Sequence, residues 1–402
     1  MHDVVIVGAR CAGSALALML ARQGLKVLAI DRATFPSDTM SGHFIHPAGV
    51  SCLRRLGLLE DLKALGAPAQ DTMTLDFGPI VLSGRPEPAP DATAAAYAPR
   101  RYRFDPMLAD AAVAAGASLR EGVSFVEPLV EGGRVAGIRT RNAAGRTEDI
   151  RARLIVGADG KRSRLAKTVG AQVYDHRPAA TCMYYAYWGG FDTPDTRLFI
   201  REGLFGAAAA TNDGLTFLGI VWPHAELARV RADIGNAYRE AAATIPWIAD
   251  RLASATQAER FVGTGDLDGF MRTASGPGWA LLGDAGHHKD PITAQGMTDA
   301  LLDAELLAAA VVEGMSGNRP LDAALSDYGR RRDAAARPMH GLTAEFAGLA
   351  APPPAMIELL HALRGNPADT ARFLGVIART VAVDDFYAPA NLARITGGEL
   401  AA

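Results

Sequence analysis

Short apolar runs and a stretch of helical spacing alternate over the start of the chain. Residues 3–8 read DVVIVG, a continuous run rich in Val and Ile that favours a buried parallel strand. Residues 14–24 carry apolar side chains at helical spacing and stop at Gly24, a residue that suits the end of a helix. Residues 26–31 form a second apolar run that closes on an acid. The pattern predicts a β-α-β unit of about 30 residues.

The pattern changes near residue 180 and changes back near residue 279. Before this point, residues 106–117 have helical spacing, and residues 123–160 form strand-like runs joined by glycine turns. Residues 182–223 are richer in aromatic side chains with strand-like alternation, which predicts a separate, mainly antiparallel sheet. Residues 279–288 return to a short apolar strand, and a long helix follows. The second sheet is therefore inserted into the first lobe.

Two other segments complete the expected organisation. Residues 83–99 are rich in Pro and Ala and predict a loop or hairpin between two lobes. The tail from about residue 320 is Ala-rich and predicts helices, with a break at the stretch APPPA. We therefore expect an α/β fold. The discontinuous first domain is expected at residues 1–75, 99–178 and 270–325. The inserted sheet domain is expected at residues 76–98 and 179–269, and the helical C-terminal segment at residues 326–402.

Length, charge and cysteine content narrow the class of protein. At 402 residues the chain is too long for one ordinary core. A formal net charge of −3 without a basic stripe argues against nucleic-acid binding. The distant cysteines Cys11, Cys52 and Cys182 fit neither a metal site nor a disulfide framework, so we expect no metal and a cytoplasmic protein. The sequence also predicts no signal peptide and no membrane span of about 18 apolar residues.

The turn after the first strand reads VGARCAGS and carries two of the three glycines of a dinucleotide-binding fingerprint. Gly8 suits the tight turn and Gly13 suits close packing of helix on strand, whereas Arg10 replaces the middle glycine. Asp31 follows Gly13 by 18 positions, where an acid would hydrogen-bond a ribose. The turn either holds a pyrophosphate, with Arg10 adding a cation, or it only joins a strand to a helix.

Two further strand-to-helix turns favour the nucleotide. GADGKRSRL places Asp159 and Gly160 after an apolar strand, and GDAGHHKDPITAQG places Asp284 after another strand, with Gly296 opening a helix. The free N–H groups at a helix N-terminus attract an anion or an electron-rich carbonyl. Because the three turns lie far apart in the sequence, we expect them to converge on one extended cofactor.

As a set, these motifs resemble the class A FAD-dependent monooxygenase superfamily, which includes aromatic hydroxylases, flavin halogenases and geranylgeranyl reductases. The resemblance covers about residues 1–325, in the order and spacing of the family. It implies a Rossmann-like FAD-binding domain, an inserted antiparallel sheet that binds substrate, and a helical C-terminus. It also implies FAD as cofactor.

The resemblance places the FAD contacts on these turns. It puts residues 8–14 at the pyrophosphate, Asp31 at the adenosine, Asp284 at the ribityl–phosphate part and residues 294–297 at the flavin ring. The full implied set is Gly8, Arg10, Cys11, Ala12, Gly13, Ser14, Asp31, Arg32, Ser41, Gly42, Arg101, Phe125, Asp159, Gly160, Gly283, Asp284, Pro291, Ala294, Gln295, Gly296 and Met297.

The activity implied by the resemblance is oxygen transfer to a small molecule. Reduced flavin would react with molecular oxygen to give a C4a-hydroperoxide, which hydroxylates or epoxidises an aromatic or polyketide-like substrate. NAD(P)H would deliver electrons at the same site, unless a separate flavin reductase delivers them. The sequence leaves both a monomer and a homodimer open.

Two other activities of the same superfamily and one non-catalytic role are weighed against oxygen transfer. A flavin-dependent C=C reductase of the geranylgeranyl reductase type is the first alternative. A halogenase is disfavoured, because the Trp-x-Trp-x-Ile-Pro signature is missing and no lysine can be assigned to handle hypohalous acid. A non-catalytic binder, like the prenyl-protein escort proteins, is disfavoured by the intact third turn.

Candidate catalytic and substrate residues come from two segments. His43 and His46 lie in SGHFIHP, a loop that the family places beside the flavin ring, and either could act as a base for a phenol or indole, or only bind loop backbone. Tyr185 and Tyr187 share one face of a predicted strand by alternation, and with Trp222 they are candidates for substrate contact or for an ordinary aromatic core.

Overall fold

The predicted β-α-β unit is present at the start of the computed structural model, which describes residues 1–397. Strand β1 (His2–Val7) leads into helix α1 (Cys11–Ala21) and then into strand β2 (Val27–Ile30). β1 lies between two parallel neighbours, β2 and β8 (Thr147–Gly157). The last four residues of β1 and all of β2 are buried, which is why both read as continuous apolar runs.

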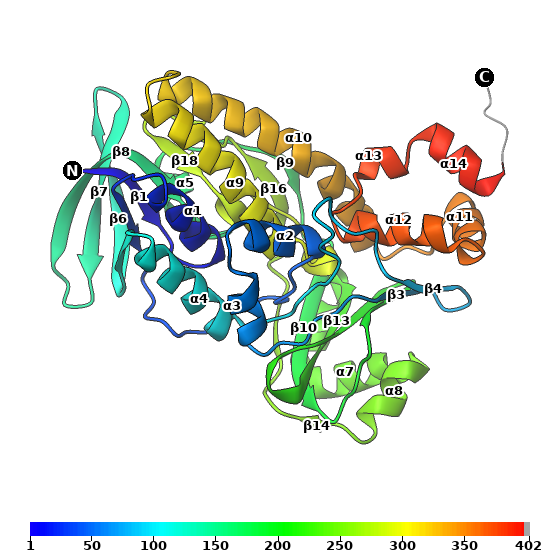
Figure 1. Cartoon of the computed structure of the whole chain (residues 1–402). Helices are drawn as coiled ribbons and strands as arrows, with labels where there is room; N and C mark the ends of the chain where they lie inside the picture. Colours follow the sequence, from blue (N-terminus) through cyan, green and yellow to red (C-terminus); the bar gives the residue numbers. More distant parts are fainter. Residues whose placement is uncertain (398–402) are drawn as a thin grey trace.

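The first sheet is built from pieces that lie far apart in the sequence. Its order is β17-β18-β8-β1-β2-β5, and the hairpin β6–β7 extends it through β7, which pairs with β8. Helices α1, α4 and α9 pack together over a buried apolar core, and α10 packs on α9 (Figure 1). The bounds of these elements are Ser275–Gly276 (β17), Trp279–Leu281 (β18), Ser118–Arg120 (β5), Val123–Glu131 (β6), Arg134–Asn142 (β7), Arg101–Ala114 (α4), Gly296–Met315 (α9) and Leu321–Ala347 (α10).

Between β2 and the second sheet the chain forms two helices, whereas the sequence pattern of residues 42–66 predicts a turn and then one helix. Helix α2 (Pro47–Arg55) is followed by α3 (Leu59–Ala64). Gly57 has a φ of +70° between them, a left-handed conformation that a continuous helix cannot contain. The helical prediction is confirmed, and its division follows from this one glycine.

The second sheet is mainly antiparallel, as the alternation predicted. Its order is β14-β10-β13-β12-β11-β3-β4, and β15 also pairs with β10. Because β3 begins at Met73, the chain enters this sheet slightly before the expected boundary at residue 76. The strands are Thr256–Gln257 (β14), Thr181–Gly189 (β10), Leu215–Pro223 (β13), Leu204–Ala210 (β12), Thr196–Arg201 (β11), Met73–Asp76 (β3), Val81–Gly84 (β4) and Val262–Thr264 (β15).

Two groups of helices pack against the second sheet. Helices α6 (Leu227–Ala232), α7 (Ile234–Ala243) and α8 (Pro246–Leu252), which the pattern did not predict, contribute to a core with one face of the second sheet. The C-terminal helices pack near β3 and β4 (Figure 1), and the predicted break at APPPA separates α10 from the first of them. They are α11 (Pro354–Arg364), α12 (Pro367–Ile377), α13 (Val383–Phe386) and α14 (Pro389–Thr396).

A small third sheet is formed by segments in which the chain passes between the first and the second sheet. It consists of β9 (Val173–Arg177), β16 (Gly269–Arg272) and β19 (His287–His288). Together these observations confirm the expected fold class: an α/β FAD-binding type of fold with a second, mainly antiparallel sheet and a helical C-terminus. Among residues 1–397, no helix is both long enough and apolar enough to cross a membrane.

Replacing Gly13 by alanine tests the packing at the start of α1. A Cβ at residue 13 would lie 1.8 Å from the carbonyl oxygen of Gly8, so the turn would have to move. We expect Gly13→Ala to destabilise the protein by about 3 kcal/mol or more. The matched control is Gly341→Ala on α10, where a Cβ meets no atom within 4 Å and alanine should stabilise by about 0.5–1 kcal/mol. Thermal melting of both variants checks this, and equal melting temperatures would contradict it.

Candidate functional site

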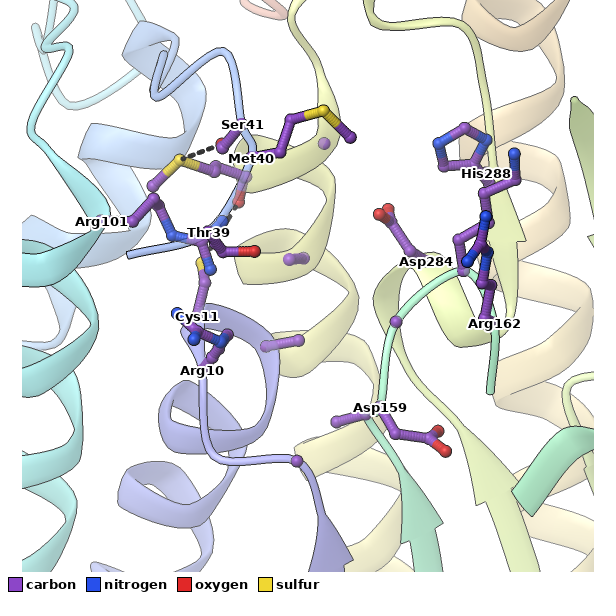
Figure 2. Close-up of a pocket in the computed structure, with 18 of the residues that line it drawn as sticks. Arg10, Cys11, Thr39, Met40, Ser41, Arg101, Asp159, Arg162, Asp284 and His288 are labelled. Carbon is purple, nitrogen blue, oxygen red and sulfur yellow. Dashed lines mark hydrogen bonds between the residues drawn. The ribbon is translucent and has the colours of Figure 1, made fainter. Parts of the chain in front are cut away.

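One elongated cavity of about 820 Å³ brings the three sequence turns together. Its wall is formed by the turn between β1 and α1, the loop after β2, the turn after β8, and the segment from β18 to α9. Met183 and Tyr185 of β10 and Gly263 and Thr264 of β15 close it from the second sheet. Figure 2 shows Arg10 and Cys11 on one wall, with Asp159 and Asp284 on the other.

The two fingerprint glycines are required by close backbone contacts. Gly8 has a φ of +103°, and a Cβ there would lie 2.3 Å from the carbonyl oxygen of Ala158 in the turn after β8. Gly13 packs against Gly8 itself, so the helix starts directly on the strand end. Helix α1 begins at Cys11, and the N–H groups of its first turn are available to an anion. Burial raises the pKa of the Cys11 thiol to about 12, so this thiol stays protonated at neutral pH.

Asp31, Asp159 and Asp284 all line the cavity, and the first two of them have different hydrogen-bond partners. Both carboxylate oxygens of Asp31 accept backbone N–H groups, from Ala9 and from Ala33, each at 2.8 Å. Asp159 accepts the N–H of Arg164 with Oδ2 at 2.8 Å, while its Oδ1 is buried without a partner among residues 1–397. A buried, unpaired acceptor in the cavity wall suits a hydroxyl donor of a nucleotide cofactor. The residues present therefore fit FAD.

At the start of α9 the cavity wall contains a buried cluster of charges. Lys289 forms an ion pair with Asp299 in the first turn of α9, and Arg379 lies 3.4 Å from the other carboxylate oxygen. Burial alone would raise the pKa of Asp299, but the charges of Lys289 and Arg379 lower it to about 2. The cluster lies beside the N-terminus of α9, whose partial positive charge adds to that of Lys289, while Asp284 and Asp290 also line this end of the cavity.

Sequence reasoning did not assign Lys289 or Arg379 to the site. Lys289 stands in the stretch KDP of the third turn, and nothing in its local sequence indicates a partner. Arg379 carries no local signal, because it reaches Asp299 from the segment after α12. Only the folded chain brings these residues together.

Most of the predicted FAD contacts line the cavity, and four do not. Gly13 and Ser14 lie behind the turn, where the Ser14 hydroxyl donates to the carbonyl of Ala9 at 2.6 Å. Gly283 is also absent from the wall. The Gln295 amide donates to the carbonyls of Thr293 and Ile377 at 3.0 and 2.9 Å, which ties the start of α9 to the C-terminal segment. The structure thus gives Gln295 a supporting contact rather than a place in the wall.

The two candidate histidines have different surroundings. His46 precedes α2, its Nε2 lies 3.0 Å from the carbonyl of Thr293, and it does not line the cavity. Of the two alternatives for His46, the structure shows the hydrogen bond to loop backbone, and the residue makes no contact with the cavity that would support a role as base. His43 does line the cavity, and its Nε2 is hydrogen-bonded to the hydroxyl of Tyr187. The Nδ1 of His43 is buried without a partner among residues 1–397.

The environment of His43 keeps its ring neutral. Burial, aided by the charge of Arg101, lowers the pKa of His43 to about 3. Its partner Tyr187 lies under the guanidinium of Arg100, 3.8 Å from the ring centroid. Burial also raises the pKa of Tyr187. A neutral imidazole with one free ring nitrogen can accept or donate a hydrogen bond at the cavity.

The faces of the second sheet are now assigned. Tyr185 and Tyr187 share a face with Met183, as alternation predicted, and the Tyr185 hydroxyl accepts the N–H of Ser41 at 3.3 Å. Trp222 pairs with Cys182 and packs in the core that this sheet forms with α6–α8, so it lies on the opposite face. Of the two alternatives for Trp222, the structure shows the ordinary aromatic core. Alternation groups residues by face, but it does not say which face the cavity takes.

A sequence model of the FAD binding domain family matches residues 1–262. The chain belongs to this family. FAD is therefore its cofactor, and the protein is an FAD-dependent oxidoreductase. Both conclusions agree with the fit of the cavity.

Curated relatives place the chain within a varied group of flavoproteins. It is 25% identical over 337 residues to conditioned medium factor receptor 1 of Dictyostelium discoideum, covering 79% of this chain and 64% of the relative, so the chain spans less than two thirds of that protein. It is 27% identical over 329 residues to 6-methylpretetramide 4-monooxygenase of Streptomyces rimosus, covering 78% and 76%. Relatives of similar identity include a chlorinase and a digeranylgeranylglycerophospholipid reductase.

Solved structures support the fold. The myxobacterial chondrochloren halogenase superimposes with a TM-score of 0.81 at 23% identity, covering 94% of this chain and 96% of the halogenase. At this identity the likeness shows the fold alone. The resemblance stated from the motifs, to a superfamily of monooxygenases, reductases and halogenases, is confirmed by these comparisons.

The buried histidines predict a loss of stability in acid. Burial lowers the pKa of His46 to about 4, so between pH 6.5 and pH 4 the unfolded chain binds more protons than the folded one. Stability is fully present above pH 6.5 and falls as the pH decreases, by about 2 kcal/mol from His46 between pH 7 and pH 5. Melting temperatures at these two pH values should differ less in His46→Gln than in the parent protein. The exposed His361→Gln serves as control, and an unchanged difference in His46→Gln would contradict the assignment.

Proposed function

We propose that this protein is a monooxygenase that uses NAD(P)H and molecular oxygen to hydroxylate or epoxidise an aromatic or polyketide-like small molecule. The observation that carries the proposal is the His43–Tyr187 pair, which lies where the cofactor cavity meets the second sheet. A hydroxyl-bearing aromatic placed there could donate a hydrogen bond to His43 Nδ1, the ring nitrogen that has no partner among residues 1–397, and so be oriented for the reaction.

Each part of the cavity has a role in this proposal. FAD, when bound, supplies the electron transfer and the reaction with oxygen. The turn at Gly8 and the start of α1 would bind its phosphates, and the N-terminus of α9 beside Lys289 would suit an electron-rich part of the ring. The Tyr187 hydroxyl holds the His43 ring in place through Nε2. The Tyr185 ring packs beside the Tyr187 ring, with 5.7 Å between the ring centroids.

Halogenation is the second candidate, and two observations favour it. The chondrochloren halogenase has a closely similar fold, and the cavity wall contains two lysines, Lys161 and Lys289, which the sequence did not assign. Lys161 forms an ion pair with Asp266 at 2.6 Å. The ammonium group of Lys289 is buried in an ion pair with Asp299, so it is not a free amine that could react with hypohalous acid. This pairing is the reason that we prefer oxygen transfer. A C=C reductase is the third outcome that the experiment below distinguishes.

One prediction of the proposed function concerns the flavin itself. The purified protein should be yellow, and NADPH or NADH should bleach it in the absence of oxygen, because the monooxygenase accepts electrons directly. Reaction under ¹⁸O₂ with a panel of phenolic, indolic and polyketide-like compounds should then add one labelled oxygen to a product, read by mass spectrometry. A halogenated product formed with added chloride or bromide would support the second candidate. A reduced product without label would support the reductase, and either result would overturn the proposal.

The second prediction concerns His43. With the compound that gives labelled product, His43→Asn should lower kcat by about 10- to 100-fold, because the hydrogen bond that orients the substrate is lost. The rate is calculated per bound FAD, because His43 lines the cofactor cavity and its loss can change the FAD content. Trp222→Phe is the matched control: it changes an aromatic side chain on the opposite face of the same sheet and should leave kcat unchanged. Equal kcat in His43→Asn and the parent protein would exclude His43 from catalysis.

A further inference from the structure

The arginine that replaces the middle fingerprint glycine has a defined set of partners. Arg10 Nη1 donates to Asp105 Oδ2 at 2.8 Å and to the carbonyl of Ser37 at 3.2 Å. Its Nη2 donates to the Ser37 hydroxyl at 3.0 Å. The guanidinium also lies over the ring of Phe35, 5.6 Å from its centroid. The planar fork of Arg10 therefore connects the first turn to the loop after β2.

The charge of Arg10 is already partly used by a buried acid. Asp105 on α4 is fully buried, and it forms ion pairs with both Arg10 and Arg101, at 2.8 and 2.9 Å. A buried carboxylate is costly unless it is paired and hydrogen-bonded. This arrangement fixes the Arg10 fork in one orientation, directed at Ser37 rather than extended freely into the cavity.

Residues 37–43, which we name the strap, depend on such side-chain contacts. The strap contains no helix or strand, and none of its residues forms a backbone–backbone hydrogen bond within residues 1–397. Its first half is held by Arg10 and by Arg100, whose Nη2 donates to Asp38 Oδ2 at 3.1 Å. Its second half is held by the contacts of Ser41 with Tyr185 and of His43 with Tyr187.

The strap also forms part of the cavity wall. Residues 39–43 line the cavity that fits FAD, and Met40 among them is half exposed to solvent. In Figure 2 the strap residues Thr39, Met40 and Ser41 lie on the same side of the cavity as Arg10 and Arg101. A segment without its own backbone bonds can separate from a cavity at low cost once its side-chain anchors are lost.

We propose that Arg10 is a positioning residue that clasps the strap over the cavity, so that FAD is retained by the strap as well as by the glycine turn. The glycine that the fingerprint expects would leave Ser37 and Asp105 without this partner. On this view the departure from the fingerprint is a functional substitution. The proposal depends on FAD binding, which the family membership shows, and it does not depend on the substrate or on oxygen transfer.

The competing explanation is that Arg10 acts as a cation on the FAD pyrophosphate. Two substitutions separate the explanations. Arg10→Lys keeps the charge and loses the fork, whereas Ser37→Ala keeps Arg10 and removes one of its hydrogen-bond acceptors. A direct phosphate contact predicts that both variants retain FAD nearly as well as the parent protein. A role of Arg10 in holding the strap predicts that both variants release FAD faster than the parent protein.

The experiment measures FAD release from the loaded protein by the rise in flavin fluorescence on dilution. We expect release to be about 10- to 100-fold faster in Arg10→Gly, and about 3- to 10-fold faster in Arg10→Lys and in Ser37→Ala, since a hydrogen bond to a charged group is lost. The double variant Arg10→Gly/Ser37→Ala should release FAD no faster than Arg10→Gly alone, because the two residues act through one contact.

Hydrogen exchange of the strap supplies a second readout. Peptides that cover residues 37–43 of the FAD-loaded protein should exchange faster in Arg10→Lys and Ser37→Ala. Arg162→Ala, which removes an exposed cation from the same cavity wall without touching the strap, should leave this exchange unchanged. If Arg10→Gly fails to fold, Ser37→Ala carries the test.

Two outcomes would overturn the proposal. The first is parental FAD release in both Arg10→Lys and Ser37→Ala. The second is faster exchange of the strap without faster FAD release, which would mean that the strap does not retain the cofactor. Because no substrate is added, a failure of the monooxygenase proposal would not affect either result.

Discussion

The site depends on the close approach of two backbone turns at the ends of neighbouring parallel strands. The turn after β1 passes so near the turn after β8 that a side chain at Gly8 would overlap the carbonyl of Ala158. Asp31, at the end of the next strand, fastens the first turn through the N–H of Ala9. This contact sets the start of α1 and places Asp159 in the cavity wall. The FAD site is thus fixed by backbone geometry before any side chain contacts a ligand.

Buried carboxylates then bring distant segments to this frame. Asp105 pairs with Arg10 and Arg101, and Asp299 pairs with Lys289 and Arg379. Each acid is shared by two cations, so each cluster carries a formal excess of one positive charge in the wall of a cavity that must hold a pyrophosphate. The same arrangement connects the strap to the first turn and the C-terminal segment to α9. Retention of an anionic cofactor and integrity of the wall therefore depend on the same ion pairs.

Local patterns predicted the parts of the structure that local forces determine. The continuous apolar runs of β1 and β2, the glycine turns and the alternation along β10 depend on neighbours in sequence, and their predictions are confirmed. The face of β10 that meets the cavity depends instead on α6–α8, which cover the other face and carry Trp222 into the core. The contact of Arg379 with Asp299 spans 80 positions of chain, and no spacing rule reaches so far. Sequence patterns therefore located the cofactor turns well and the supporting charges poorly.

The second sheet contributes fewer residues to the cavity wall than its aromatic strands suggested. Phe205 and Val221 of the second sheet pack against Ile292 and against Leu349 beyond the end of α10, so that part of the sheet is filled by protein. What the sheet contributes to the wall is Met183, Tyr185 and β15, next to His43 on the strap. A substrate must then meet a histidine whose position is set by the same segment that covers the cofactor. Under the proposed function, selection of substrate and retention of FAD would be coupled through the strap, because His43 belongs to it and lines the cavity.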